Sequence, residues 1–136
     1  MRTVETDASD DELISAVRSW VNLLAIGDFA AAVQFLGPPT AASDAEPWTA
    51  NSLETYIANY GSWDPLDDGR RMRVTPIESA GGSLTPQFEV YRNDDRPPSI
   101  EFDLPLNGEW SDLTALFELV EVDGKWAFTL YDLRVL

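Results

Sequence analysis

Histidine and cysteine are both absent from this chain of 136 residues, and lysine occurs once, at Lys125. The missing histidine removes the usual general base near neutral pH, and the missing cysteine removes thiolate nucleophiles and disulfides. Both absences also remove the usual ligands of zinc and other transition metals. We therefore expect no cofactor and no metal, and we favour a binding protein over an enzyme.

Negative charge dominates the composition. The chain has 24 Asp and Glu against nine Lys and Arg, which gives a formal net charge of −15. Charge of this sign disfavours nucleic acid and anionic membranes as partners and favours a basic protein. The acidic residues are spread along the chain and Arg outnumbers Lys, so a GC-rich genome or adaptation to salt explains the composition equally well.

The apolar content predicts one folded domain over residues 1–136. Hydrophobic residues make up 44% of the chain, with five Trp, four Tyr and six Phe, which is too many for a disordered protein. We expect residues 1–8 to be disordered. The start lacks the pattern of a secretory signal, and no apolar run is long enough for a membrane span. A bacterial or archaeal cytoplasmic protein is the expectation.

Two helices are expected before residue 37. Ser9 and Glu12 match a capping box, in which each side chain accepts a hydrogen bond from the other residue's backbone, and apolar residues then recur at helical spacing. Gly27 supplies the left-handed conformation that ends this helix. Asp28 then caps a short second helix over residues 29–36.

A third helix is expected after a loop at residues 37–47. Asn51 and Glu54 match a second capping box, and Gly61 ends the helix. Between them, apolar and aromatic side chains form a stripe with i, i+3, i+4, i+7 spacing. The stripe consists of Leu53, Tyr56, Ile57 and Tyr60.

Strands are expected in the C-terminal half, where the hydrophobic period changes from 3.6 to 2. Asn107-Gly108 and Asp123-Gly124 are strong signals for hairpin turns of type I′. The expected strands lie near residues 71–78, 86–93, 98–104, 111–122 and 125–136.

The two hairpin turns fix an expected register for the last three strands. The first turn places Leu113 opposite Phe102, and the second places Ala115 opposite Asp132. One sheet face then collects Ile100, Phe102, Leu104, Leu113, Ala115, Phe117, Leu119, Trp126, Phe128 and Leu130. The opposite face carries Glu101, Asp103, Asp112, Thr114, Glu118 and Thr129.

The expected fold class is α+β, because the helices must pack on the apolar face of this sheet. We predict two to three N-terminal helices on one face of a curved antiparallel sheet of about five strands. Such a chain resembles the NTF2-like (cystatin-like) α+β cone. The Gly27-Asp28 break after residues 20–26 and the sequence Asp123-Gly124-Lys125-Trp126 are similar to motifs of that superfamily, and residues 104–114 resemble small uncharacterised bacterial domains.

Two features limit what the resemblance implies. The chain departs from the family pattern, because no strand is expected between the second and third helices. Enzymes of the superfamily often use an Asp–His pair in the cone. Without histidine, that chemistry transfers to no position of this chain.

Asp132 is the candidate catalytic residue. In the expected register it is the only charge well inside the apolar face, where a desolvated carboxylate could act as an acid or base or anchor a ligand. Leu133 and Val135 are apolar in the opposite phase, so a β-bulge near Tyr131 would instead turn Asp132 outwards. The sequence leaves both alternatives open.

Four aromatic residues around the third helix are candidate binding residues at the rim of a pocket. The helical spacing of Tyr56 and Tyr60 fits core packing equally well, with their hydroxyl groups at the rim. The four candidates are Trp48, Tyr56, Tyr60 and Trp63.

Two charged segments have simple structural explanations. Arg70, Arg71 and Arg73 form the one basic cluster, and we expect them to pair with neighbouring acids, with a phosphate or carboxylate site as the alternative. The acidic segment 64–69 fails the EF-hand pattern, because Leu66 occupies a ligand position. We expect a solvated turn there and no metal site.

Three functions fit these observations. The first is a non-catalytic acidic domain that binds a basic protein, as immunity proteins and antitoxins do. The second is an NTF2-like small-molecule-binding protein or acid–base enzyme with Asp132 in the pocket. The third is a domain that assembles, for example as a homodimer, through the outer face of the sheet. The sequence favours the first, with neither nucleic acid nor a membrane as partner.

Overall fold

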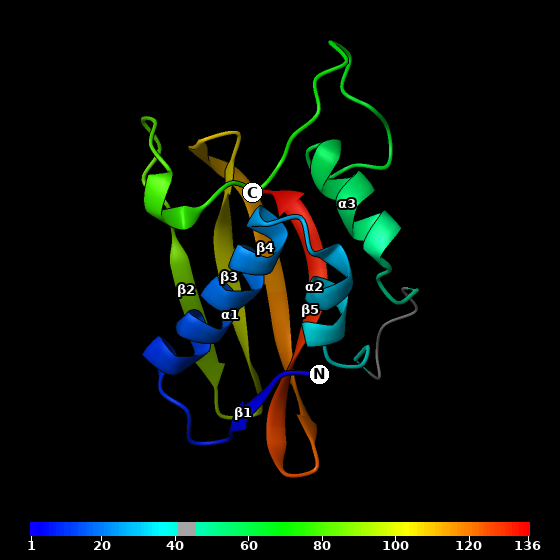
Figure 1. The fold of residues 1–136 in the computed structure, drawn as a ribbon. Coiled ribbons are helices and arrows are strands. Elements are labelled where there is room, and N and C mark those ends of the chain that lie inside the picture. The colour runs from blue at the N-terminus through cyan, green and yellow to red at the C-terminus, as the bar shows by residue number, and fades with distance from the viewer. Residues whose placement is uncertain (41–45) are drawn as a thin grey trace.

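Three helices pack against a curled antiparallel sheet of five strands in the order β1-β5-β4-β3-β2 (Figure 1). The computed structural model describes residues 1–40 and 46–136, so the middle of the loop expected at 37–47 lies outside the described residues. The predicted α+β class is confirmed. The helices are α1 (Asp10–Ala25), α2 (Phe29–Phe35) and α3 (Ala50–Ala58), with a 3₁₀ turn at Ile77–Ser79. The strands are β1 (Thr3–Glu5), β2 (Phe88–Asn93), β3 (Arg96–Leu106), β4 (Glu109–Val122) and β5 (Lys125–Val135).

The first two helices begin where their caps predict. The Ser9 hydroxyl oxygen accepts a hydrogen bond from the Glu12 backbone N–H (3.2 Å), and an Asp28 carboxylate oxygen accepts one from the Ala31 N–H (3.0 Å). Gly27 separates the two helices in a left-handed conformation, with φ +79°. These contacts satisfy backbone groups that the ends of helices otherwise leave without partners.

The cap of α3 lies two residues earlier than predicted. Thr49 and Ser52 form the reciprocal capping box, and the expected box of Asn51 with Glu54 is wrong because both residues lie inside the helix. Thr49 has an extended backbone, with φ −113° and ψ 165°. That is the conformation an N-cap residue requires, so it fixes where the helix starts.

Trp20 of α1 anchors the core between the helices and the sheet. Its ring meets Phe117 of β4 edge-on, with 5.0 Å between ring centroids, and its indole N–H donates to the carbonyl oxygen of Ala32 in α2 (3.1 Å). The inner face of the sheet is the predicted one. Of the ten apolar side chains expected there, all are buried except Trp126, which is half-buried.

Both predicted hairpin turns form. Asn107, Gly108, Asp123 and Gly124 all have positive φ, as a type I′ turn requires. The strand pairs that flank the second turn follow the predicted register up to the pairing of Phe117 with Leu130.

The pairing of β3 with β4 shifts between Asp103 and Pro105, where β4 contains two extra residues. Ala115 therefore lies opposite Phe102, and the predicted pairing of Leu113 with Phe102 is wrong. Side chains alternate between faces along a strand, so a shift of two residues returns each one to its predicted face. The inner face is unaffected for this reason.

Residues 71–78 do not form the predicted strand. Val74 makes an isolated bridge with Leu106 of β3, and the Met72 N–H donates to the carbonyl oxygen of Ala58 in α3 (2.9 Å). The segment thus crosses from α3 to the β3–β4 hairpin and does not lie along a neighbouring strand.

The fifth strand comes instead from the N-terminus, which corrects the expected disorder of residues 1–8. Thr3–Glu5 forms β1 and pairs with β5. Gly37 continues this edge, because its N–H donates to the carbonyl oxygen of Phe128 (2.7 Å). A Cβ atom at position 37 would lie 2.8 Å from the Cβ of Ala127, so the close approach requires glycine.

Candidate binding surface

A one-residue β-bulge in β5 decides where Asp132 lies. Tyr131 has no partner residue on β4, so Asp132 pairs with Leu116 on the outer face. Fully buried Leu133 takes the inner position opposite Ala115 that the regular register gave to Asp132. The regular pairing is therefore wrong and the bulge alternative is confirmed, because one extra residue exchanges the two faces.

The Asp132 carboxylate is held at the surface. Its Oδ1 accepts a hydrogen bond from the Leu133 N–H (2.8 Å), and its Oδ2 lies 3.8 Å from an Arg134 nitrogen. The Asp132 side chain is 31% exposed. Because it lies outside the inner face, the carboxylate cannot act on a ligand held there, but it can attract a cation from solvent.

Three of the four predicted rim aromatics meet beside Asp132. The ring centroids of Trp48 and Tyr56 are 5.6 Å apart, and those of Tyr56 and Trp63 are 4.9 Å apart. The Trp48 indole N–H donates to the carbonyl oxygen of Leu130 (3.0 Å), which fixes its ring against β5. These rings line a hollow of about 740 Å³ between α3 and β5, which we call the aromatic groove.

The aromatic groove is open and carries negative charge. Among the described residues that line it, Glu46 and Asp132 are acidic and none is basic. Trp63 is 61% exposed and Tyr131 is 53% exposed, so two large aromatic surfaces face solvent. Exposed apolar surface gathered in one place is typical of a binding site.

The Tyr56 ring lies between those of Trp48 and Trp63 in this groove. Burial, and then the negative charge of Asp132, raises the pKa of Tyr56 above its ordinary value. The phenol therefore remains neutral at physiological pH and keeps its O–H as a hydrogen-bond donor.

Tyr60 lies outside the aromatic groove. Its hydroxyl donates to an Asp112 carboxylate oxygen, and burial followed by this hydrogen bond raises the pKa of Tyr60 to about 12. Tyr60 and Gly61 both have positive φ and turn the chain after α3. The structure thus separates Tyr60 from the other three candidates and gives it a contact that ties α3 to β4.

Carboxylates also occupy the outer face of the sheet. Glu89 of β2 lies directly opposite Glu101 of β3, and the same row continues across Leu116 of β4 to Asp132 of β5. The row therefore ends at the aromatic groove. Sequence reasoning missed Glu89, because no two-residue turn signal fixes the register between β2 and β3.

We use the term acidic face for Glu89, Glu101, Asp103 and Glu118. The last three were predicted to share the outer face, and they do. None of the four forms a salt bridge within residues 1–40 and 46–136. Glu101 accepts a hydrogen bond from the Tyr91 hydroxyl (3.2 Å) and Asp103 accepts one from the Thr114 hydroxyl (2.7 Å), but no Lys or Arg of the described residues forms an ion pair with the four carboxylates.

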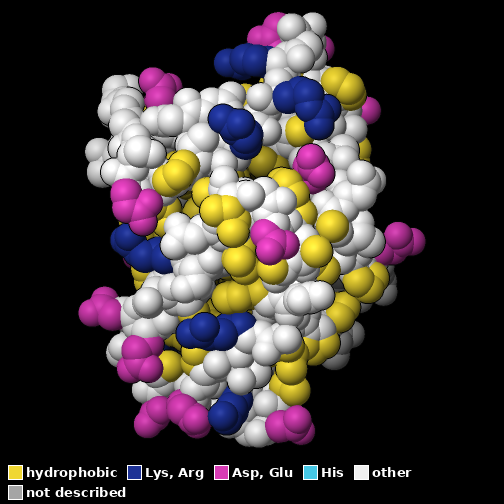
Figure 2. Space-filling view, in the orientation of Figure 1, with side chains coloured by type: hydrophobic (Ala, Val, Ile, Leu, Met, Phe, Trp, Pro, Cys, Tyr) yellow, Lys and Arg dark blue, Asp and Glu magenta, His cyan; other side chains and the backbone are white. Residues whose placement is uncertain are grey.

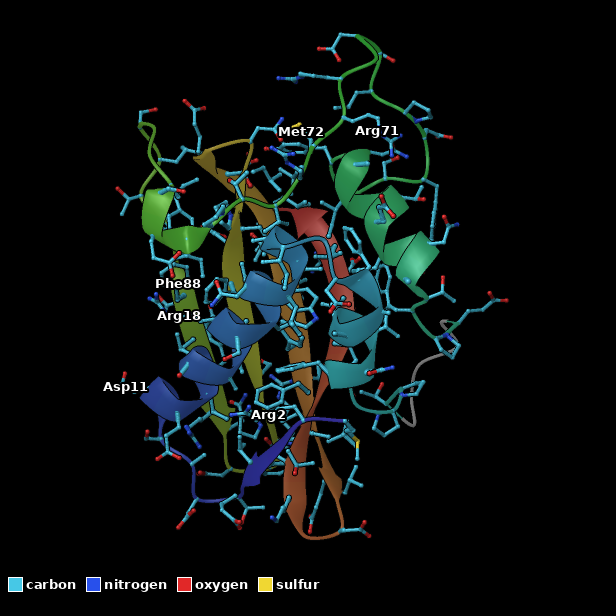
Figure 3. All side chains as sticks on the ribbon, viewed as in Figure 1. Arg2, Asp11, Arg18, Arg71, Met72 and Phe88 are labelled. Atoms are coloured by element: carbon cyan, nitrogen blue, oxygen red, sulfur yellow. The ribbon has the colours of Figure 1, made fainter. Side chains whose placement is uncertain are left out.

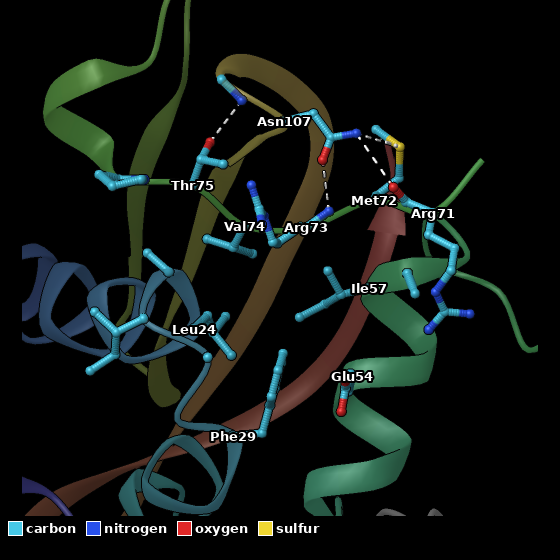
Figure 4. Close-up of a pocket in the computed structure, with 16 residues that line it drawn as sticks. Leu24, Phe29, Glu54, Ile57, Arg71, Met72, Arg73, Val74, Thr75 and Asn107 are labelled. Atoms are coloured by element: carbon cyan, nitrogen blue, oxygen red, sulfur yellow. Dashed lines mark hydrogen bonds between the residues drawn. The ribbon is translucent and has the colours of Figure 1, made fainter.

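A second hollow, of about 1180 Å³, lies at the C-terminal ends of α1 and α3 (Figure 4). Leu24, Ile57 and Val74 form its apolar floor, and Arg71 and Arg73 line it. Basic side chains gather at this end of the molecule (Figure 2). The expected pairing of these two arginines with acids is wrong for the described residues, which give neither a salt bridge. The carbonyl ends of the two helices carry partial negative charge that the arginines can offset.

The acidic segment 64–69 is a turn with a local ion pair. Arg70 lies 3.2 Å from an Asp68 carboxylate oxygen, and its backbone N–H donates to the same side chain (2.9 Å). In the part of the chain that the structure describes, no three acidic side chains converge as a metal site would require. No helix within those residues combines the length and apolarity that crossing a bilayer needs.

The fold and the surface define the class as an α+β domain with a curled antiparallel sheet, an acidic outer face and an open aromatic groove. Residues 21–136 match the family described as "Domain of unknown function (DUF7668)". The match covers more than half of the chain, and the chain belongs to this family. No curated protein and no solved structure matches it.

Proposed function

We propose that this chain is a non-catalytic binding domain that receives a basic protein on its acidic face, as immunity proteins and antitoxins do. The direct pairing of Glu89 with Glu101 carries the proposal. Like charges placed directly opposite one another destabilise a sheet, and no salt bridge among the described residues offsets this cost. A basic partner would supply the missing positive charge.

The net charge of −15 supports the same proposal. A negative surface speeds the encounter with a positive partner and excludes acidic ones, and added salt weakens both effects. We therefore expect a complex that forms rapidly at low ionic strength and loses affinity as salt rises.

The other two functions receive less support. A homodimer through the acidic face would bring carboxylates against carboxylates, which costs free energy. A small-molecule site or acid–base enzyme built on Asp132 requires that carboxylate inside the cone, and the bulge at Tyr131 puts it outside. Both functions would gain support from a metabolite or a second copy that co-purifies with the chain.

We also propose that the domain is a divergent member of the NTF2-like superfamily. The support is the order of elements, with helices before a long antiparallel meander, together with the curl of the sheet (Figure 1). An experimental structure that superposes on NTF2-like cones over the helices and strands β2–β5 would test this proposal.

Affinity capture tests the proposed function. The immobilised chain is exposed to a lysate of the native host at low salt, and bound proteins are eluted by salt and identified. The decisive variant carries Glu89→Gln with Glu101→Gln, which removes the opposed charges and keeps the shape. We expect the wild type to retain a basic protein and this variant to lose it.

A matched control removes the same charge elsewhere. Asp67→Asn with Glu78→Gln lies outside the acidic face, and both side chains are exposed and form no salt bridge within the described residues. This control should capture as much partner as the wild type. The proposal fails if no basic protein is retained at low salt, or if the acidic-face variant retains as much as the control.

A further inference from the structure

We infer that the aromatic groove receives an arginine side chain of the basic partner, an assignment that rests on the proposed function. The rings of Trp48, Tyr56 and Trp63 follow one another at 5.6 and 4.9 Å and form a continuous aromatic wall. The faces of aromatic rings attract cations, and Trp does so most strongly. Asp132 lines the same groove and supplies a full negative charge.

Arginine matches this combination better than lysine does. Its planar guanidinium group stacks on aromatic rings and also binds a carboxylate through two parallel N–H groups. The chain already contains a contact between a guanidinium group and an aromatic ring. The guanidinium of Arg18 in α1 lies 5.2 Å from the ring centroid of Phe88 in β2 (Figure 3).

The groove is formed before any partner binds. Trp48 is held by its hydrogen bond to the carbonyl oxygen of Leu130 (3.0 Å), and the carbonyl oxygen of Trp63 accepts a hydrogen bond from the Asn59 side chain (3.1 Å). Asn59 is itself buried. The Trp48 ring and the Trp63 backbone are thus held in place before binding, which lowers the entropy lost when a partner binds.

Arg134 is the one cation near the Asp132 carboxylate in the described structure. Its nitrogen lies 3.8 Å from Oδ2, and its side chain is 53% exposed. An exposed pair at this distance contributes little stability. An incoming guanidinium group can therefore displace Arg134 from Asp132 at small cost.

Continuity with the acidic face favours a protein side chain over a small organic cation. The outer-face row from Glu89 and Glu101 runs across Leu116 and reaches Asp132, which also lines the groove. A basic protein docked on the acidic face can thus extend an arginine into the groove. The groove volume of about 740 Å³ accommodates that side chain together with part of its backbone.

Nuclear magnetic resonance with ¹⁵N-labelled protein tests the inference. The first probe is the peptide acetyl-(Gly-Arg)₃-Gly-amide, and the second replaces each arginine with citrulline, which has nearly the same shape but no charge. The third probe is tetramethylammonium chloride. We expect the arginine peptide to shift the indole N–H signals of Trp48 and Trp63 and to leave that of buried Trp20 unchanged.

Two single variants locate the site. Trp63→Ala and Asp132→Asn should each weaken the binding of the arginine peptide by roughly three- to thirtyfold. Leu84→Ala removes an exposed apolar side chain outside the groove, and Asp95→Asn removes one exposed negative charge at the turn between β2 and β3. These two controls should bind the peptide as the wild type does.

Three results would overturn the inference. The first is that the citrulline peptide binds as tightly as the arginine peptide, and the second is that both groove variants keep the wild-type affinity. The third is that tetramethylammonium binds and the arginine peptide does not, which would assign the groove to a small cation. The proposed function fails separately. If the groove binds the arginine peptide but no basic protein is captured from the lysate, the groove stands and the proposed function falls. If a basic protein is captured equally well by both groove variants, the proposed function stands and this inference falls.

Discussion

The two faces of the sheet differ in the polarity and burial of their side chains. On the inner face, Trp20 and the strand side chains are apolar, buried and in mutual contact. On the outer face, Glu89 and Glu101 stand opposite one another although their repulsion opposes folding. The difference shows that the inner face provides the stability of the fold. The opposed carboxylates of the outer face do not add to that stability, which is why we propose a basic partner for them.

Removing Trp20 is the strongest test of the inner face. Trp20→Ala deletes a fully buried ring and should lower the free energy of unfolding by about 3–5 kcal/mol. Chemical denaturation measures the loss. Trp63→Ala removes the same ring from an exposed position and should cost less than about 1 kcal/mol. Trp63 follows α3 and does not belong to the sheet, so equal losses would contradict the idea that the buried side chains of the inner face provide the stability.

Gly61→Ala tests how tightly the chain turns onto the inner face. Gly61 has φ +82°, and an added Cβ would lie 2.8 Å from the Leu113 side chain and 3.1 Å from the Leu133 carbonyl oxygen. We expect a loss of roughly 1–3 kcal/mol in thermal or chemical unfolding. Gly69→Ala is the matched control, because Gly69 also has positive φ but has no atom within 4 Å of the added Cβ. A smaller loss at Gly61 than at Gly69 would show that crowding is relieved there.

Glu101→Lys tests the outer face and should increase stability. It converts the like-charge pair with Glu89 into an opposite-charge pair, worth about 0.2–1 kcal/mol. The gain should shrink in high salt, which a salt series of melting temperatures measures. Asp94→Lys makes the same charge change at the exposed turn between β2 and β3. If both variants gain equally, the effect comes from net charge and not from the pairing.

The pH dependence of Tyr60 should be measurable only above about pH 10, so it does not change stability near neutral pH. Its pKa is about 12 in the folded chain, against about 10 when unfolded, so the folded state keeps a proton that the unfolded state loses. This contribution is present below pH 10 and disappears as the pH rises towards 12. Tyr60→Phe should make unfolding less pH-dependent in that range, as melting temperatures would show. Tyr131→Phe is the control, and an identical profile in both variants would exclude Tyr60 as the source.

Local chemistry made much of the inner face predictable. The turns at Asn107-Gly108 and Asp123-Gly124 fix the strand pairing beside them, because a type I′ turn leaves no freedom of register. The bulge also left a signal, since Leu133 is apolar in the wrong phase for a regular strand. Three of the four candidate aromatics lie in one groove for a related reason, because they flank a single helix that packs beside β5.

Long-range contacts explain what the sequence could not indicate. Residues 71–78 alternate like a strand, but their backbone partners come from α3 and from the β3–β4 hairpin. The three residues of β1 are too few to show a period, and pairing with β5 alone orders them. The pair of Glu89 with Glu101 depends on the register across the turn after β2, which no local signal sets.

The contact of Gly37 with β5 has a consequence for how the protein behaves in a crowded solution. A free sheet edge offers carbonyl groups to strands of other molecules and so promotes aggregation. Here the carbonyl oxygen of Phe128 already accepts from the Gly37 N–H, and that of Leu130 accepts from the Trp48 indole. A side chain at position 37 would push this segment away from Ala127 and open the edge. One missing methyl group thus helps to keep neighbouring molecules from joining their sheets.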